Sequence, residues 1–170
     1  MTNENILLVV VLLAAAALDY KIRKVPNIIT FPAILYGISL GLFHGAYIGL
    51  TSSFLGLLLG IALLSIPYAM GGIGAGDLKL LGAIGALKGP VFVFESFLGA
   101  AIIGGLMAVG RMAFIIKGPD TMILRDSIKS VYYSGALSVI ELPENALKGS
   151  IPYAVAISGG AVAALLLELH

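Results

Sequence analysis

Residues 71–79 read Gly-Gly-Ile-Gly-Ala-Gly-Asp-Leu-Lys and interrupt a chain that is otherwise strongly apolar. The stretch follows one hydrophobic segment, precedes another, and places the carboxylate of Asp77 directly after a run of glycines. Burying a charge near hydrocarbon is so unfavourable that an ionisable residue in such a segment is by default a candidate functional residue, with a partner to be found. The best candidate for that partner is Asp19, which ends the first apolar run.

The composition of the whole chain places it in a lipid bilayer. Of its 170 residues, 59% are hydrophobic and only 11% are charged, and the mean hydropathy is +1.07. An average soluble domain has about 25% charged residues. A membrane span needs ~20 largely apolar residues, so the chain has room for at most about six or seven helices. We predict an all-α integral membrane protein in which residues 1–170 form a single domain.

Six apolar segments predict a bundle of six transmembrane helices, over residues 3–20, 28–47, 51–70, 77–88, 91–116 and 151–169. The fourth is short, because about 13 residues at ~1.5 Å per residue give roughly 20 Å. The hydrocarbon core is ~30 Å thick. We therefore expect the glycine loop before it to dip into the membrane and to carry Asp77 below the cytoplasmic surface.

The positions of Lys and Arg predict the orientation of the bundle. Lys21, Arg23 and Lys24 follow the first helix, and the positive-inside rule makes that loop cytoplasmic. On the same topology nine of the ten Lys and Arg residues lie on the cytoplasmic side, and Lys88 lies outside. We expect a multi-pass protein of the cytoplasmic (inner) membrane, with its N-terminus outside and both aspartates near the inner surface.

Two further patterns concern packing and the membrane surface. Residues 117–150 have a lower hydropathy and the 3.6-residue period of an amphipathic helix, which predicts a cytoplasmic surface helix between the fifth and sixth spans. Glycines recur at intervals of four residues in the second and third helices, which is typical of a face that another helix approaches closely. These glycines are Gly37, Gly41, Gly45 and Gly49, and then Gly56 and Gly60.

On this topology Asp19 closes one helix and Asp77 opens another at the same depth, so the two carboxylates can meet. A close carboxylate pair does not ionise fully and tends to share a proton; one member can then activate water while the other donates to a carbonyl oxygen. This is the chemistry of an aspartic protease. Gly74 and Gly76 suit a loop that a substrate backbone approaches closely. The alternative is that Asp19 caps or snorkels at a helix end and that Asp77 only caps the fourth helix.

Several other chemistries lack the necessary residues. The absence of cysteine excludes disulfides, thiolate metal sites and a cysteine nucleophile. The only histidines are His44, on the predicted outer side, and His170. The chain therefore lacks the histidines that a zinc protease or a Ser-His hydrolase needs in its active site. No βαβ pattern surrounds the glycine run, which argues against dinucleotide binding. We expect no metal, no cofactor and no nucleic-acid partner.

The stretch Gly-Ala-Gly-Asp-Leu-Lys-Leu-Leu-Gly-Ala at residues 74–83 resembles the GxGD signature of the type IV prepilin peptidases. Asp19 with residues 23–27 resembles their first aspartate motif, and residues 151–157 are similar to their last-helix motif. The resemblance implies a membrane aspartic endopeptidase with Asp19 and Asp77 as its catalytic dyad. It would cleave the basic leader peptide from prepilin-like precursors after a glycine, at the cytoplasmic membrane face.

The sequence departs from the larger members of that family, which carry an extra N-terminal segment and a cytoplasmic loop with paired CxxC motifs. Without cysteine the corresponding zinc site is out of reach, and N-methylation is left open. The chain is more similar to the minimal peptidases of tight-adherence (Flp-type) pilus systems, with the archaeal preflagellin peptidases as an alternative. The expected partners are prepilin-like precursors and the lipid bilayer, and a homo-oligomer is left open.

Lys79 and Asn27 are further candidates for binding substrate or shaping the site. The alternative for Lys79 is a lysine at the membrane interface, and for Asn27 a cap of the second helix.

Two other classes of protein compete with the peptidase. In a small transporter or channel component, Asp19 and Asp77 would bind a proton or cation at the inner mouth. The chain has no detectable internal repeat, and both acids lie at one end of the predicted bundle. In an assembly scaffold the glycine faces would suffice and the acids would be dispensable.

Overall fold

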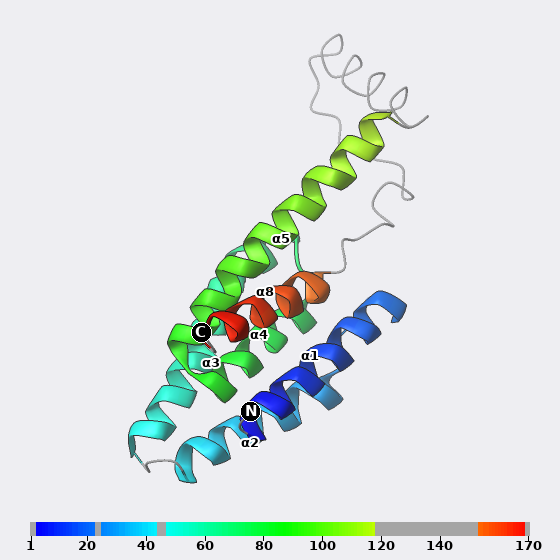
Figure 1. Cartoon of the computed structure of the whole chain (residues 1–170). Helices are drawn as coiled ribbons and strands as arrows, with labels where there is room; N and C mark the ends of the chain where they lie inside the picture. The colour runs from blue at the N-terminus through cyan, green and yellow to red at the C-terminus, as the bar shows by residue number, and fades with distance from the viewer. Residues whose placement is uncertain (1–2, 23–24, 44–46, 118–152, 169–170) are drawn as a thin grey trace. The chain divides into compact units, whose positions relative to one another are not determined.

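The computed structural model describes residues 3–22, 25–43, 47–117 and 153–168, and its helices are shown in Figure 1. The predicted all-α class is confirmed for these residues. The six helices are α1 (Asn3–Ile22), α2 (Asn27–Phe43), α3 (Tyr47–Ala69), α4 (Ala75–Lys88), α5 (Pro90–Lys117) and α8 (Tyr153–Glu168). The amphipathic helix predicted within residues 117–150 lies almost wholly outside the described residues.

Each predicted apolar segment contains a helix, with shifted ends. The largest shifts are of four residues: α2 ends at Phe43 rather than near Tyr47, and α3 begins at Tyr47 rather than near Thr51. Thr51 lies one turn inside α3, where its hydroxyl donates a hydrogen bond to the carbonyl oxygen of Tyr47, at 2.9 Å. Three helices are long and apolar enough to cross a membrane, over residues 5–22, 47–69 and 90–110. The helices α2 and α8 are shorter apolar helices.

The chain divides into two compact units, and the contacts described below all lie in the first. The first unit contains residues 1–104 and 152–170, and the second contains residues 105–151. The first unit therefore joins the two ends of the chain in one body. The single domain predicted for residues 1–170 stays a prediction.

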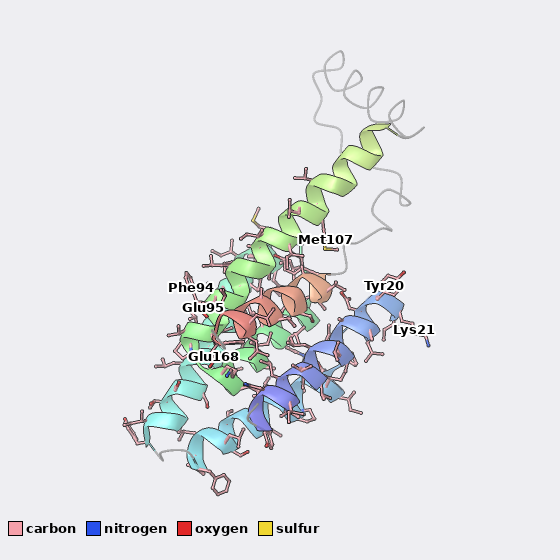
Figure 2. The ribbon with its side chains drawn as sticks, viewed as in Figure 1. Tyr20, Lys21, Phe94, Glu95, Met107 and Glu168 are labelled. Atoms are coloured by element: carbon pink, nitrogen blue, oxygen red, sulfur yellow. The ribbon has the colours of Figure 1, made fainter. Side chains whose placement is uncertain are left out.

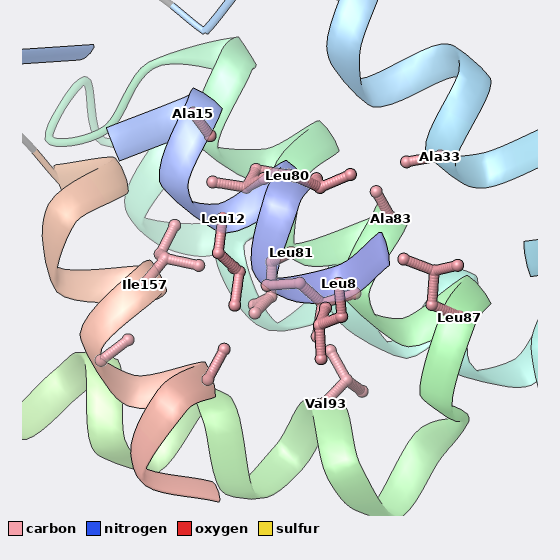
Figure 3. Packing of buried hydrophobic residues seen from close by; sticks show 14 of the residues in the cluster. Leu8, Leu12, Ala15, Ala33, Leu80, Leu81, Ala83, Leu87, Val93 and Ile157 are labelled. Atoms are coloured by element: carbon pink, nitrogen blue, oxygen red, sulfur yellow. The ribbon is translucent and has the colours of Figure 1, made fainter. Parts of the chain in front are cut away.

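The helix α4 lies at the centre of the first unit. It packs against α1, α2, α3 and α8. Its residues from Leu80 to Leu87 are all buried, as expected for a helix that is apolar on every side. Figure 3 shows Leu80 and Leu81 of α4 beside Leu12 of α1 and Ile157 of α8. Because α4 is enclosed in this way, the side chain of Asp77 in its first turn enters the interior of the protein.

The predicted glycine faces bring backbones into direct contact. A Cβ atom added to Gly37 of α2 would lie 2.6 Å from the carbonyl oxygen of Ala86 in α4. One added to Gly60 of α3 would lie 2.6 Å from the carbonyl oxygen of Leu81. No side chain larger than hydrogen fits at these separations, so the predicted packing face is confirmed at Gly37 and Gly60. Gly45 lies outside the described residues.

Two glycines with positive φ reverse the chain at the two ends of α4. Gly71, with φ of 76°, follows α3 and begins the loop that leads to Asp77. Gly89, with φ of 86°, joins α4 to α5, and its N–H donates to the carbonyl oxygen of Gly85 at 2.8 Å. Residues with a side chain rarely adopt this conformation. The two turns fix where the short helix α4 begins and ends.

Candidate active site

Asp19 lies in the last turn of α1 with only 6% of its surface exposed. Its Oδ2 atom accepts a hydrogen bond from the backbone N–H of Ala154, at 3.1 Å, in a buried setting. Ala154 is in the first turn of α8, where backbone N–H groups have no partner within their own helix. Asp19 therefore caps α8 from a neighbouring helix. The alternative in which it snorkels to the surface beside Lys21 is wrong.

Asp77 is the third residue of α4 and is 8% exposed. Its Oδ2 atom accepts a hydrogen bond from the N–H of Gly74 at 3.3 Å, so the capping interpretation of Asp77 is confirmed for this oxygen. The other oxygen, Oδ1, is buried and has no hydrogen-bond partner among the described residues. A buried acceptor without a partner costs free energy and calls for an explanation, such as a ligand or a shared proton.

The fold brings the two aspartates together from distant parts of the sequence. They lie close enough for the negative charge of Asp19 to act on the carboxyl group of Asp77. Both are buried, so this interaction is weakly screened by solvent. Within the described part of the chain, no three His, Cys, Asp or Glu side chains are grouped as metal ligands. The chemistry that this arrangement can supply is proton transfer between two carboxyl groups.

The two glycines of the predicted site differ in the space around them. A Cβ atom added to Gly76 would lie 3.0 Å from both the Cβ atom and the carbonyl oxygen of Val25, which precedes α2. Gly76 therefore allows the segment before α2 to pass directly over the first turn of α4. At Gly74 the added atom would make only an ordinary contact, 3.4 Å from Oδ2 of Asp77, and the backbone is extended, with φ of −80°. No described neighbour demands glycine at position 74.

This difference predicts different results for two alanine substitutions. We expect Gly76→Ala to lower the free energy of unfolding by about 1 kcal/mol, because the Val25 backbone must shift. Gly74→Ala should change it by less than about 0.5 kcal/mol. Chemical unfolding of both variants in detergent measures the difference. Equal destabilisation would contradict the geometry, and a stable Gly74→Ala variant that fails to cleave precursor would assign Gly74 to substrate approach.

Lys79 and Asn27 contact each other across two helices. The Nζ atom of Lys79 in α4 donates a hydrogen bond to Oδ1 of Asn27, the first residue of α2, at 2.9 Å. The same ammonium group lies 5.4 Å from the centre of the Phe31 ring. The pair ties the start of α2 to the helix that carries Asp77, as a site-shaping role requires. Direct contact of either residue with substrate stays a prediction.

A double-mutant cycle separates these two roles. If Lys79 and Asn27 act as one unit, then Lys79→Met, Asn27→Ala and the double variant should all lower kcat/KM by about the same factor. If each residue bound substrate by itself, the two losses would multiply. Rates of precursor cleavage by the three variants decide between the outcomes, and multiplied losses would reject the shared role.

The start of α8 lies at the aspartates, although no residue there was predicted to belong to the site. Ala154 contributes a backbone N–H, which no side-chain pattern reveals. Tyr153 interacts electrostatically with Asp77. A Cβ atom on Gly104 of α5 would lie 3.0 Å from the Tyr153 ring, so that ring is held against α5. In the sequence, only the similarity of residues 151–157 to a last-helix motif indicated that this segment belongs to the site.

The comparison with known families agrees with this architecture. Residues 6–109 match the model of the type IV leader peptidase family. The matched region is more than half of the chain and contains both aspartates, so the chain belongs to this family. Together with its apolar helices, the family indicates a membrane protein.

Individual relatives give a narrower comparison. The chain is 34% identical over 116 residues to proteins named prepilin leader peptidase/N-methyltransferase from two Burkholderia pseudomallei strains, 1026b and K96243. Each match covers 61% of this chain and 37% of the relative, so the chain spans little more than a third of the length of these curated relatives. No solved structure matches the chain.

Proposed function

We propose that this protein is a membrane aspartic endopeptidase that removes the basic leader peptide of type IV prepilin-like precursors at the cytoplasmic membrane face. The observation that carries the proposal is the buried pair of Asp19 and Asp77 in a member of the leader peptidase family. Asp19 and Asp77 are its catalytic dyad. Lys79, Asn27, Gly74 and Gly76 shape the site around them.

The proposed reaction uses one shared proton. The ionised carboxylate takes a proton from a water molecule as the water oxygen attacks the carbonyl carbon of the scissile bond. The protonated carboxyl donates its proton to the carbonyl oxygen, which gives a tetrahedral diol. Return of a proton to the amide nitrogen then breaks the C–N bond and releases a carboxyl group and an amine. The Oδ1 atom of Asp77, buried without a described partner, is available to hold the water or the carbonyl group.

The proposed setting is a six-helix transmembrane bundle with the aspartates on the cytoplasmic side. Large apolar side chains are exposed on several helices, for example Leu13 (65%), Leu35 (68%) and Ile102 (65%). Apolar surface that is so widespread marks contact with lipid. Lys21, two residues beyond Asp19, supports the inward orientation of that end of α1. A precursor helix would enter sideways from the bilayer and leave its basic leader in the cytoplasm.

A reconstituted assay tests the proposal. The purified protein in liposomes is given a synthetic precursor with a basic leader, a glycine and an apolar helix, and the products are analysed by mass spectrometry. We expect cleavage on the carboxyl side of the glycine, and slower cleavage when the basic residues of the leader are replaced by glutamine. An intact precursor, combined with a proton flux across the same liposomes that Asp77→Asn removes, would favour the transporter instead.

A further inference from the structure

A second polar cluster lies at the other end of the helices that carry the aspartates. Lys88 is the last residue of α4, and its side chain is only 9% exposed. Its Nζ atom donates to Oδ1 of Asn5 in α1 at 3.0 Å and lies 2.8 Å from Oε2 of Glu168 in α8. It also lies 5.3 Å from the centre of the Phe92 ring. One ammonium group thus connects α4 to both α1 and α8.

The same three helices meet at the aspartates. At that end α1 supplies Asp19, α4 supplies Asp77, and α8 supplies the N–H of Ala154. Figure 2 shows Tyr20, which follows Asp19 in the sequence, at one end of α1, and Glu168 at the far end of α8. At ~1.5 Å per residue, Asp77 and Lys88 are ~16 Å apart along α4. The three helices are therefore joined at both ends by polar contacts, and the packing between is apolar except for the hydrogen bond that Ser158 Oγ of α8 donates to the carbonyl oxygen of Leu12 in α1, at 3.1 Å.

The glycine contacts fix α4 against α2 and α3, whereas its contacts with α1 and α8 involve several small side chains. The buried positions of α8 include Ala154, Ala156, Ala161 and Ala164, and those of α1 include Ala15. Small side chains form a smooth surface along which a helix can slide. A shift of α1 and α8 by one turn, ~5.4 Å, relative to α4 would separate Asp77 from Asp19. A contact that discriminates between registers is needed elsewhere.

The ion pair joins a largely buried Lys88 side chain to a half-exposed Glu168, and it suits that task better than it suits stabilisation. Its desolvation cost largely offsets its attraction, so its net contribution to stability is small. A wrong register, however, would leave the buried charge of Lys88 without its partners, which is strongly unfavourable. The best-attested use of buried polar groups is to fix register in this way.

We infer that Lys88, held by Asn5 and Glu168, is a positioning residue that sets the register of α4 against α1 and α8 and so aligns Asp77 with Asp19. This inference rests on the proposed catalytic role of the aspartate pair. It assigns a function to the single basic residue that the sequence analysis placed outside the membrane, far from the chemistry.

The first test compares substitutions at the two ends of the ion pair. Lys88→Met keeps the apolar stem and removes the charge, and Glu168→Gln keeps the shape and removes the negative charge. Each should lower kcat for precursor cleavage about tenfold with little change in KM, because a small misalignment of reacting groups costs rate rather than substrate binding. The matched control is Glu95→Gln on α5, an exposed acid for which we expect no change.

Charge reversal provides the rescue. In the double variant Lys88→Glu with Glu168→Lys, the pair is restored with opposite polarity. The Asn5 side chain can rotate to offer its NH₂ group to the new carboxylate, since an amide is both donor and acceptor. We expect the double variant to recover most of the lost kcat, whereas Lys88→Glu alone should be the least active of the set.

A distance measurement separates register from other effects and does not depend on cleavage. The chain has no cysteine. Spin labels on Tyr20→Cys and Ala75→Cys, both exposed positions next to the aspartates, therefore report the separation of α1 and α4 by electron paramagnetic resonance. In Lys88→Met the distance distribution should shift or broaden, and the charge-reversed variant should restore it.

The outcomes distinguish the two proposals. An unchanged distance distribution in folded Lys88→Met overturns the inference, whether or not cleavage falls. If Lys88→Met does not fold, Glu168→Gln carries the same measurement, because it keeps the contact between Lys88 and Asn5. If the distance shifts in Lys88→Met but the wild-type protein does not cleave precursor, the register role is retained and the peptidase is rejected.

Discussion

Asp19→Asn and Asp77→Asn should each abolish precursor cleavage while leaving the fold intact. Asparagine has almost the same shape as aspartate, and its carbonyl oxygen can still accept the hydrogen bonds that Ala154 and Gly74 donate. It cannot exchange a proton at neutral pH. General acid–base catalysis by one group contributes about 10²–10⁴-fold, so each variant should lose roughly a thousandfold or more in kcat.

The losses of activity caused by the two substitutions should not be additive. Residues that act as one catalytic unit lose most of their effect when the first is removed, so the double variant should be about as inactive as either single variant. Mass spectrometry of the products measures cleavage, and circular dichroism with thermal unfolding in detergent checks the fold. Retention of more than a tenth of the wild-type rate by either folded variant would contradict the dyad.

Gly56→Ala should be among the most damaging single substitutions in the protein. The added Cβ atom would lie 2.7 Å from the carbonyl carbon of Gly85 and 2.8 Å from that of Gly89. Both obstacles are backbone atoms of the central helix and its turn, so no side chain can rotate away. The helices α3 and α4 must separate, and we expect a loss of about 3 kcal/mol in the free energy of unfolding.

The matched control for this prediction is Gly105→Ala. A Cβ atom added to Gly105 of α5 meets no atom of the described residues within 4 Å, and alanine favours a helix by about 1 kcal/mol over glycine. Its stability should stay the same or rise. Unfolding by a denaturing detergent in mixed micelles measures both variants. A Gly56→Ala protein within about 0.5 kcal/mol of the wild type would reject the close approach of α3 and α4.

Hydropathy predicted the six helical segments, because a helix in lipid needs a long apolar run. Glycine spacing predicted the packing face, because small residues let two helices approach closely. The meeting of Asp19 and Asp77 was predicted for a similar reason, since alternating spans bring the end of the first and the start of the fourth to one side. The predicted cytoplasmic location of that side and the catalytic role of the pair stay proposals.

Contacts made by backbone groups or by single distant side chains could not be predicted in the same way. The N–H of Ala154 is common to every residue type, so its bond to Asp19 leaves no mark in the sequence. Lys88 was predicted to lie on the outer side, and nothing in the sequence indicated that it binds Asn5 and Glu168, which lie near opposite ends of the chain. Hydropathy gives the depth of a residue and not its neighbour on another helix.

Asp77 shows that a structural and a functional interpretation of one residue can both hold. Its Oδ2 atom caps α4, which is a sufficient reason for an acidic residue at that position. Capping does not explain why the second oxygen is buried without a partner among the described residues. This second oxygen is the feature of Asp77 on which its proposed catalytic role rests, beyond its role as a helix cap.

The central claim is that the side chains at positions 19 and 77 meet, and a bridging reagent tests it directly. Because the chain has no cysteine, Asp19→Cys with Asp77→Cys introduces the only two thiols. A short bifunctional thiol reagent that spans only a few ångströms should join them within one molecule, as detected by mass spectrometry after digestion. If each thiol reacts singly and no bridged product forms in the folded protein, the account is contradicted.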